Sequence, residues 1–361
     1  MLKAGAYGLG VAGYARELAE AGCRRFGVAE PFEAMELLRV LRGSGAADAG
    51  SRVQILSSVL PDEIVEMVDA GVVLPVTGLA EAEAIGAAAV RLGKRATVHL
   101  KIDSGMGRLG ILAEEAVDTV GKIVKTEGLD CEGVFSHCPV AYDPSDPFTA
   151  EQIAAFSGIV SRLADKGILF RYVHIAASDA INNFPAAASL PFNMVRTGIN
   201  LHGSFDPQGR RVLDVEPVLT LKTRVAQVRE LPAGTTLGYG RTWKLGRKTR
   251  VATVSAGYAD GLPLALTNRG EMFIGGVRCP VIGRISMDYA TVDVSAVESV
   301  ECGDEVICLG KCGDDAITPD DWARIKGTHA YDIICSLGAR VERVLADGRL
   351  PADEAGLQEF K

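Results

Sequence analysis

The chain has 361 residues, of which 48% are hydrophobic and 23% charged, and its formal net charge is −8 at pH 7. This length favours two domains, and the hydrophobic fraction is sufficient for sizeable cores. The acidic balance argues against a nucleic-acid partner, because binding to phosphates requires a basic face. Since we find neither an apolar run of about 18 residues nor a secretory signal, we expect a cytoplasmic protein without a membrane partner.

The eight cysteines are expected to be free thiols, because a chain of this length without a secretory signal seldom depends on disulfides. They are Cys23, Cys131, Cys138, Cys279, Cys302, Cys308, Cys312 and Cys335. Cys302, Cys308 and Cys312 lack the paired spacing of a zinc site and have no histidine nearby, so no metal site is predicted.

The chain opens with a lysine at the end of a short apolar run. Lys3 is followed by Tyr7 and by glycines at positions 5, 8 and 10. Lysine can condense with an aldehyde, and glycines allow a close backbone approach and a tight turn into a helix. The helix is indicated by apolar residues on one face, from Val11 to Ala19. We therefore place Lys3 at a strand end, although a solvated surface lysine is the simpler interpretation of this residue alone.

Short β-rich runs alternate with amphipathic helices up to about residue 200. The β-rich runs are the one before Gly5 and residues 25–29, 53–58, 72–77, 96–103, 131–137, 172–176 and 192–197. Helices are predicted over residues 31–42, 61–70, 79–92, 114–126 and 149–166. Eight strands alternating with helices predict an α/β fold of the (β/α)8 TIM-type barrel, with a doubly wound sheet as the alternative.

The pattern changes near Arg210, where a mostly β C-terminal domain is predicted to begin. Antiparallel strands are expected over residues 218–230, 249–255, 270–282 and 289–294. A helix near residues 319–325 and an apolar run at 333–337 follow. We predict a barrel domain over residues 1–211 and a C-terminal β domain over residues 212–361.

The predicted strand ends carry a set of polar residues that suits a phosphorylated aromatic aldehyde. Active sites of such barrels lie on the loops that follow the strands. Lys3 is the candidate for the imine, while Ser178 and the amides of Gly198 and Ile199 are candidates for the phosphate. His137 and Arg196 are candidates for the aromatic ring and its nitrogen.

Each of these residues also has a structural interpretation. His137 is equally typical of a hydrogen-bonded core histidine, Ser178 of a helix cap, and Arg108 of a surface ion pair. Their coincidence on the strand ends of one barrel favours the functional interpretation.

Seven ordered segments of the chain carry sequence motifs. They are KAGAYGLG at 3–10, KIDSGMGRLG at 101–110, MVRTGI at 194–199, LGYG at 237–240, GYADG at 257–261, GRISMD at 283–288 and YDI at 331–333. Together they resemble the alanine racemase family, fold-type III enzymes that depend on pyridoxal 5'-phosphate (PLP). The resemblance runs along nearly the whole chain, and the order and spacing of the segments make it specific.

The resemblance implies a role for each matching position. Lys3 would bind PLP as a Schiff base and act as one acid/base group, and Tyr239 would be the opposite one, donated by the partner subunit of a head-to-tail homodimer. The other implied cofactor-binding residues are Tyr7, His137, Ser178, Arg196, Gly198, Ile199 and Tyr331. The implied substrate-binding residues are Arg108, Met287 and Tyr258, with Arg284 at the entry. Lys101 matches a position that can be carbamylated, which would give Arg108 a negative partner.

The implied reaction interconverts L-alanine and D-alanine and would supply D-alanine for peptidoglycan. Racemisation removes the Cα proton on one face and returns a proton on the other, which lysine and tyrosine on opposite faces can do. PLP supplies the electron sink. Arg196 stays protonated and would leave the pyridine nitrogen unprotonated, which suppresses transamination.

Several departures from the family pattern keep alternatives open. Only two residues precede Lys3, where family members usually carry a longer segment, so the first barrel strand is expected to be a stub with exposed neighbouring edges. Gly5, Leu9, Ala177 and Leu264 replace residues common in the family. The alternatives are a serine or broad-specificity racemase of the same fold and an inactive truncated PLP-binding protein. A PLP-dependent decarboxylase is disfavoured, because its glycine-rich phosphate loop and cysteine–aspartate site are not found.

Overall fold

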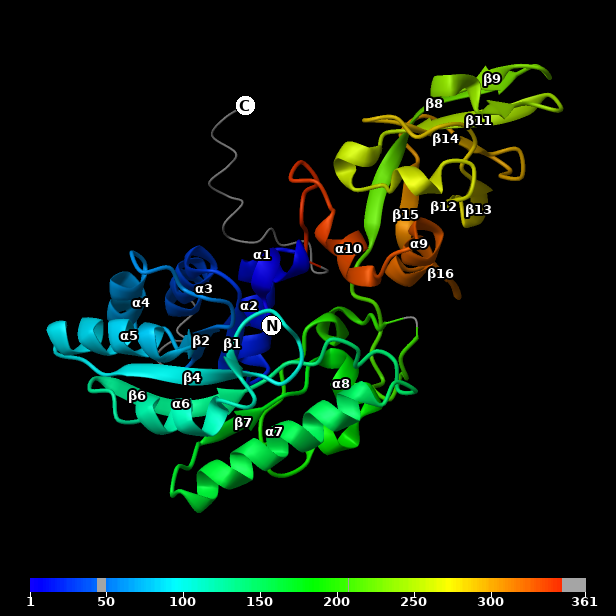
Figure 1. The fold of residues 1–361 in the computed structure, drawn as a ribbon. Helices are drawn as coiled ribbons and strands as arrows, with labels where there is room; N and C mark the ends of the chain where they lie inside the picture. Colours follow the sequence, from blue (N-terminus) through cyan, green and yellow to red (C-terminus); the bar gives the residue numbers. More distant parts are fainter. Residues whose placement is uncertain (44–49, 207, 346–361) are drawn as a thin grey trace. The chain divides into compact units, whose positions relative to one another are not determined.

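The computed structural model describes residues 1–43, 50–206 and 208–345, which divide into two compact units (Figure 1). Among the described residues, unit 1 comprises 1–43, 50–198, 208–213 and 343–345, and unit 2 comprises 199–206 and 214–342. The domain boundary between residues 211 and 212 stays a prediction, and residues 346–361 of the predicted second domain lie outside the described residues.

Unit 1 alternates parallel strands with helices. Its strands are β1 (Arg25–Val28), β2 (Arg52–Ile55), β3 (Leu74–Val76), β4 (Ala96–Asp103), β5 (Ile111–Leu112), β6 (Leu129–Phe135) and β7 (Tyr172–His174). Its helices are α1 (Lys3–Tyr7), α2 (Val11–Glu20), α3 (Pro31–Gly43), α4 (Ile64–Ala70), α5 (Leu79–Arg91), α6 (Ala116–Ile123), α7 (Phe148–Asp165) and α8 (Ser178–Asn183), with a 3-10 turn η1 (Pro185–Ala188). β1 pairs with β2, a single bridge joins Gln54 to Val73, and the sheet continues in the order β3-β4-β6-β7.

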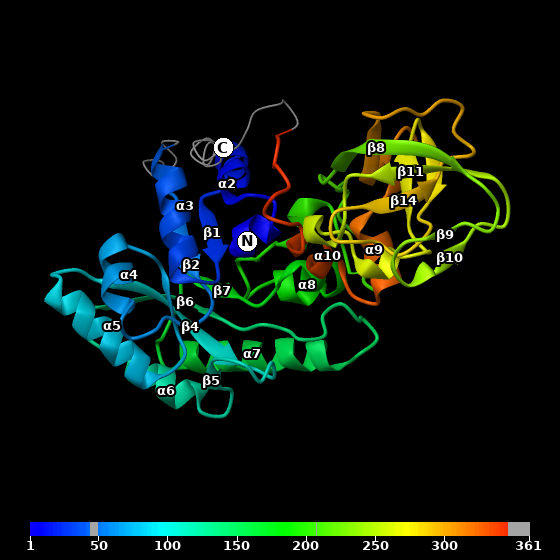
Figure 2. The same cartoon turned by 90° about the horizontal axis from the view of Figure 1, so that it is seen from above.

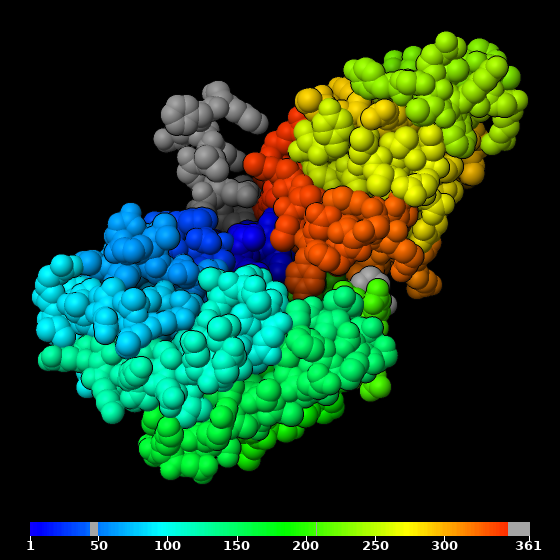
Figure 3. Space-filling model, viewed as in Figure 1, coloured from blue at the N-terminus to red at the C-terminus, as the bar shows by residue number. Residues whose placement is uncertain are grey.

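The helices of unit 1 cover the outside of its strands. Figures 1 and 2 show α3 to α7 flanking the sheet, and the space-filling view shows the segments of α5 and α7 on the outer surface of the unit (Figure 3). Strand residues such as Ile55, Leu74 and Leu100 are fully buried together with Phe156 of α7. Burial of both sheet faces explains the near-continuous apolar runs in these strands.

Two of the eight predicted β-rich runs are not strands, and this prediction was wrong for them. In the run before Gly5, Met1 N donates to Thr197 O and Leu2 N donates to Gly27 O, but two residues are too few for a ladder. Residues 192–197 form one bridge, between Ala177 and Arg196. Here the side chain of Asn193 accepts the hydrogen bond of Val173 N and so replaces a ladder partner.

The turn that carries Lys3 is left-handed. α1 consists mainly of residues 4–7, whose φ values lie between 53° and 60°. This conformation costs roughly 1–2 kcal/mol of free energy for each residue that has a Cβ atom. Three of the four residues, Ala4, Ala6 and Tyr7, have a Cβ atom. The turn closes through a 2.7 Å hydrogen bond from Gly8 N to Ala4 O. The glycines predicted a tight turn into α2, but the hand of the turn was not foreseen.

Unit 2 is built around antiparallel strands, as the sequence predicted. They are β8 (Leu221–Leu231), β9 (Thr236–Leu237), β10 (Trp243–Lys244), β11 (Thr249–Val254), β12 (Glu271–Ile274), β13 (Val277–Pro280), β14 (Ala290–Asp293), β15 (Glu305–Cys312) and β16 (Asp315–Ile317). The main sheet has the order β13-β12-β15-β8-β11-β14, with β16 on β15 and a separate β9–β10 hairpin. Helices α9 (Pro319–Lys326) and α10 (Ala330–Cys335) follow, and the 3-10 turns are η2 (Ile199–His202), η3 (Tyr239–Arg241), η4 (Tyr258–Asp260) and η5 (Leu264–Leu266).

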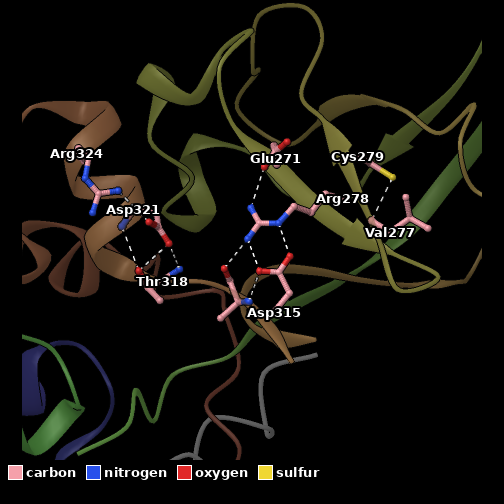
Figure 4. A network of polar contacts seen from close by, with 9 residues as sticks. Glu271, Val277, Arg278, Cys279, Asp315, Thr318, Asp321 and Arg324 are labelled. Carbon is pink, nitrogen blue, oxygen red and sulfur yellow. Dashed lines mark hydrogen bonds and ion pairs between the residues drawn. The ribbon is translucent and has the colours of Figure 1, made fainter. Parts of the chain in front are cut away.

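Polar contacts fix one edge of unit 2 (Figure 4). Arg278 of β13 binds Asp315 of β16 through two hydrogen bonds and also pairs with Glu271 of β12 at 2.8 Å. Beside this network, Asp321 closes the start of α9 by accepting hydrogen bonds from Thr318 N and Oγ1, both 2.8 Å long. These contacts hold three strands and a helix start together at the surface.

All eight cysteines are free thiols in the structure. Within residues 1–43, 50–206 and 208–345, no helix combines the length and the apolar composition needed to cross a bilayer.

Candidate functional site

Four positively charged side chains of unit 1 act on one histidine. The pKa of His137 falls to about 3 because of burial and, in decreasing order, the charges of Arg196, Arg108, Lys101 and Lys3. Lys101 and Arg108 belong to the end of β4 and the loop after it, whereas Lys3 and Arg196 belong to the two predicted runs that are not strands. The fold brings these four residues together around His137. Such a gathering of cations around a neutral imidazole favours the binding of an anionic ligand.

Arg196 is the most firmly held of the four cations. Its Nη2 donates to Ser136 O at 2.7 Å and to Ile175 O at 2.9 Å, and lies 3.3 Å from His137 Nδ1. Its Nη1 lies 2.5 Å from His174 Nδ1. The Nε–H makes no hydrogen bond within the described part of the chain. Burial lowers the pKa of Arg196 to about 10, so it remains charged at neutral pH.

A buried chain of hydrogen bonds extends from Arg196 through the strands. His174 Nε2 lies 2.8 Å from His99 Nδ1, and His99 Nε2 lies 3.2 Å from Glu132 Oε2. Burial holds the pKa of His174 well below its usual value. Burial also lowers the pKa of His99, although the contact with Glu132 acts to raise it. Both imidazoles are therefore neutral and carry one proton each. His174 accepts a hydrogen bond from Arg196 and donates one to His99, and His99 in turn donates one to Glu132.

The chain of hydrogen bonds ends in an ion pair. Arg25 binds both oxygens of Glu132, at 2.7 and 3.0 Å. Because burial of a carboxylate raises its pKa, the contacts with His99 and Arg25 are needed to hold the pKa of Glu132 at about 2. Gly133 makes room for His99, since a Cβ atom there would lie 2.6 Å from the imidazole ring.

Tyr7, Ser178 and Gly198 form a compact polar corner. Gly198 N donates to Ser178 Oγ at 2.9 Å. A Cβ atom on residue 198 would lie 2.3 Å from the Tyr7 hydroxyl, so only glycine allows the phenol to approach. Tyr7 and Ser178 are both buried. The corner therefore offers hydroxyl groups and a backbone amide at closely spaced positions, as binding of a phosphate requires.

Lys3 is exposed at the start of the left-handed turn that ends in Tyr7. The same short segment thus presents a primary amine and the phenol of the polar corner. Ala4 N, directly after Lys3, donates to the carboxylate of Glu33.

Lys101 lies near the end of β4, and Arg108 lies in the loop that follows this strand. Burial, followed by the charges of Arg108 and Arg196, lowers the pKa of Lys101 to about 8, and its Nζ donates to Leu56 O at 3.0 Å. The loop is shaped by Asp103, which accepts hydrogen bonds from the backbone amides of residues 105, 107 and 108. Although partial burial acts to raise its pKa, these donors hold the pKa of Asp103 below its usual value.

The remaining predicted site residues belong to unit 2. Tyr239 is 74% exposed and lies between two glycines with positive φ, Gly238 and Gly240. Gly238 forms a β-bridge with Arg284, which fixes the loop. The Tyr239 hydroxyl makes no hydrogen bond within the residues that the structure describes.

Tyr258 and Met287 lie on adjacent turns of unit 2. Tyr258 N donates to Ser286 O at 3.0 Å, and Ala259 N donates to Met287 O at 3.1 Å. The N–H of Met287 makes no hydrogen bond with the described residues. A Cβ atom on Gly257 would lie 2.2 Å from Met287 O, so the glycine permits this contact.

Ile199 and Tyr331 are also in unit 2. Ile199 is buried at the start of η2, directly after Gly198, and Tyr331 lies in α10 with its ring 5.4 Å from that of His329.

The residues that hold the cations in place were not predicted from the sequence. They are Glu33, His99, Asp103, Glu132 and His174. One signal was available: His99, Lys101 and Asp103 alternate along one strand and so share a face. The pairing of His174 with Arg196 has no local signal, because the two residues are 22 positions apart and meet only through the fold.

The residues of unit 1 fit a phosphorylated pyridine aldehyde. The amine of Lys3 suits the aldehyde, the polar corner suits the phosphate, and the Nε–H of Arg196 is left for a ring nitrogen. The surrounding positive charge matches the negative charge of such a group.

Comparison with known proteins agrees with this chemistry. Residues 1–206 match the family model for the alanine racemase N-terminal domain, and residues 218–345 match that for the C-terminal domain. The chain is 35% identical over 349 residues to alanine racemase 2 of Caldanaerobacter subterraneus subsp. tengcongensis, covering 95% of this chain and 87% of that protein. It is 36% identical to the alanine racemase of Desulforamulus reducens, covering 95% and 90%.

Solved structures give the same result. The alanine racemase of Streptomyces coelicolor A3(2) superposes with a TM-score of 0.87 and 31% identity, over 96% of this chain and 90% of that chain. The enzyme of Bartonella henselae, solved with covalently bound pyridoxal phosphate, gives a TM-score of 0.81 and 27% identity, over 94% and 89%. The matches confirm the expected barrel followed by a mostly β domain. The chain therefore belongs to the alanine racemase family of isomerases, which depend on pyridoxal 5'-phosphate.

Proposed function

We propose that this chain interconverts L-alanine and D-alanine with Lys3 and Tyr239 as the two acid/base groups. The observation that carries the proposal is the convergence of Lys3, Lys101, Arg108 and Arg196 on His137. The two arginines suit a phosphorylated cofactor and the carboxylate of an amino acid, while Lys3 and Lys101 supply amines that can react. When bound, PLP withdraws electrons from the Cα atom of the attached amino acid and so makes its proton removable.

The cofactor would be held by the residues that match the cofactor-binding positions of the family. Lys3 would anchor its aldehyde carbon, and Arg196 would donate to its ring nitrogen while His137 packs beside the ring. The phosphate would be bound by Tyr7, Ser178, Gly198, Ile199 and Tyr331. The chain of hydrogen bonds from His174 to Glu132 holds Arg196 in place. With a pKa of about 10, Arg196 would keep its proton at neutral pH and not transfer it to the ring nitrogen.

The substrate carboxylate would be bound by Arg108 and by the N–H of Met287, which makes no hydrogen bond within the described residues. Tyr258 would line the approach to this site. Lys101 would react with carbon dioxide: its neutral amine forms an N–C bond, releases one proton and becomes a carbamate. The negative charge formed would be stabilised by Arg108 and Arg196, whose charges already act on this amine.

We further propose a head-to-tail homodimer in which Tyr239 serves the site of the partner subunit. The exposure of Tyr239 and the absence of a hydrogen bond to the described residues support this role, because a group that completes another subunit's site must be accessible in its own. The proposed setting is the cytoplasm, with D-alanine supplied for peptidoglycan.

Proton NMR in deuterated water tests the reaction. The purified chain with PLP should remove the Cα–H signal of L-alanine and accumulate D-alanine, with L-serine as the parallel substrate. Persistence of the Cα–H signal with both amino acids would contradict the proposal, and faster exchange of serine would identify a serine racemase.

Replacement of the two proposed acid/base groups gives a sharper test. Lys3→Ala should abolish both the visible absorbance of lysine-bound PLP and the exchange of the Cα proton. Tyr239→Phe should keep the absorbance and slow exchange of the Cα proton of L-alanine with deuterated water more than exchange of the Cα proton of D-alanine. Equal slowing of the two exchange rates would show that Tyr239 does not act on one face only.

A further inference from the structure

Glu33 is a buried carboxylate whose oxygens are occupied by backbone amides. It is 7% exposed and lies in the first turn of α3. Oε2 accepts hydrogen bonds from Ala29 N at 2.8 Å and Glu30 N at 3.0 Å, while Oε1 accepts one from Ala4 N at 2.5 Å. Within the described residues Glu33 forms no ion pair, so these three amides and the N-terminus of α3 are what stabilise its charge.

Two of the three contacts are local, and the third is not. Ala29 and Glu30 belong to the junction between β1 and α3, where Glu33 closes the start of its own helix. Ala4 is 29 positions away and directly follows Lys3. Glu33 therefore joins the turn that carries Lys3 to the neighbouring strand–helix junction.

The turn needs such a contact because its conformation is unfavourable. Residues 4–7 are all left-handed, and Ala4, Ala6 and Tyr7 have Cβ atoms that disfavour this conformation. At the far end, the guanidinium of Arg343 donates to Gly8 O at 2.9 and 3.0 Å. At the near end, Glu33 supplies the side-chain contact.

We propose that Glu33 is a positioning residue for the cofactor, which holds the left-handed turn so that Lys3 and Tyr7 face the cofactor together. This inference rests on the proposed role of Lys3 as the covalent anchor of PLP. Tyr7 reaches Gly198 from the same turn, so loosening of the turn affects the anchor and the phosphate corner at once.

Glu33→Gln is the most informative variant, because it keeps the size of the side chain. A glutamine amide has one acceptor oxygen, and this oxygen retains two contacts if it faces Ala29 and Glu30. The NH2 group then faces Ala4 N, where two donors oppose each other. The variant therefore releases the turn selectively while the start of α3 stays closed.

Asp321→Asn is the matched control. Asp321 closes the start of α9 by the same type of carboxylate contact, but it lies in unit 2 and holds no proposed site residue (Figure 4). Glu33→Asp is the second variant if Glu33→Gln does not fold, because it keeps the charge and shortens the reach toward Ala4.

Three measurements on the full-length chain test the proposal. In Glu33→Gln, the Kd for PLP should rise roughly tenfold, as expected for loss of a hydrogen bond to a charged group. Amide hydrogen exchange should accelerate over residues 3–10, and kcat should fall more than KM changes. In Asp321→Asn, exchange should accelerate only near residue 318, with the Kd for PLP within about twofold of the wild type.

An unchanged Kd for PLP together with unchanged exchange over residues 3–10 in Glu33→Gln would overturn the proposal. Equal changes of the Kd in both variants would show a general stability effect and would also overturn it. If the wild-type chain itself lacks the absorbance of lysine-bound PLP, the proposed role of Lys3 fails instead, so the two failures are distinguishable.

Discussion

At the scale of single residues, the contact between Gly198 and Tyr7 gives a direct prediction. Gly198→Ala places a Cβ atom 2.3 Å from the Tyr7 hydroxyl, so the phenol must move away from the polar corner. We expect the Kd for PLP to rise by roughly tenfold or more, which is the loss of one hydrogen bond to a charged phosphate. Absorbance titration of the apo-protein with PLP measures this.

The matched control is Gly158→Ala in the middle of α7. A Cβ atom at this position meets no atom within 4 Å. Replacement of a helical glycine by alanine should stabilise the protein by about 0.5–1 kcal/mol and leave the Kd for PLP unchanged. Weaker PLP binding by both variants would contradict the steric explanation for Gly198.

A second residue-scale prediction concerns Lys101. With a pKa of about 8, about half of this amine is neutral at pH 8, and only the neutral amine reacts with carbon dioxide. With 13C-labelled bicarbonate at pH 8, we expect a carbamate signal in the 13C NMR spectrum that disappears in Lys101→Arg. The exposed Lys94→Arg is the control and should keep the signal. A carbamate signal that survives in Lys101→Arg would assign the modification to another lysine.

At the scale of the elements, the buried histidines of the strands and their ends predict how stability depends on pH. Burial and nearby cations place the pKa of His137 at about 3 in the folded chain, below the value of about 6.5 in an unfolded one. The unfolded state therefore binds more protons below pH 6.5. The contribution of neutral His137 to the free energy of unfolding is complete above pH 6.5. It is lost as the pH falls toward 3, by up to about 1.4 kcal/mol for each pH unit.

The measurement is the thermal midpoint of the apo-protein between pH 7 and pH 4, followed by far-ultraviolet circular dichroism. His137→Asn lacks the titrating group, so its midpoint should fall less steeply than that of the wild type. Parallel curves for the two proteins would show that His137 is not the group responsible. Glu132, with a folded pKa of about 2, adds a further loss as the pH falls from about 4.5 to 2.

The elements differ in how well the sequence predicts them, and the reason is physical. α3, α5 and α7 were predicted to within one residue at each end, and the presence of α2 was predicted, because their apolar periodicity is local. β5 was missed because two residues give no pattern, and β15 because its pairing with β8 depends on distant residues. The run at 192–197 looked like a strand, but a side chain of Asn193 takes the place of a ladder partner.

Lys3, Arg108, His137 and Arg196 were candidates from the sequence motifs, and in the structure the charges of Lys3, Arg108 and Arg196 act on His137. Their roles in a site stay predictions. Glu33 and His174, which hold the turn of Lys3 and the guanidinium of Arg196, were not foreseen. Their hydrogen bonds join residues that are 29 and 22 positions apart in the sequence. A contact between such distant residues produces no periodic pattern from which it could be predicted.

At the scale of the whole molecule, the proposed sharing of the site between two subunits has a consequence for mixed dimers. Lys3→Ala and Tyr239→Ala homodimers should both be inactive, since each site lacks one acid/base group. A mixed dimer, however, has one site that combines the intact Lys3 of one subunit with the intact Tyr239 of the other. Random pairing makes half of the dimers mixed, so activity should return to about one quarter of the wild-type value.

Unfolding and refolding the two variants together gives this mixture, and each variant refolded alone is the control. At a fixed equimolar ratio of the two variants, the recovered activity should rise with the square of the total subunit concentration when subunits are dilute, because assembly precedes catalysis. If both acid/base groups of a site came from one chain, every site in every dimer would lack one group, and mixing would restore nothing. Activity in the mixture therefore separates a shared site from an independent one without any measurement of the dimer's shape.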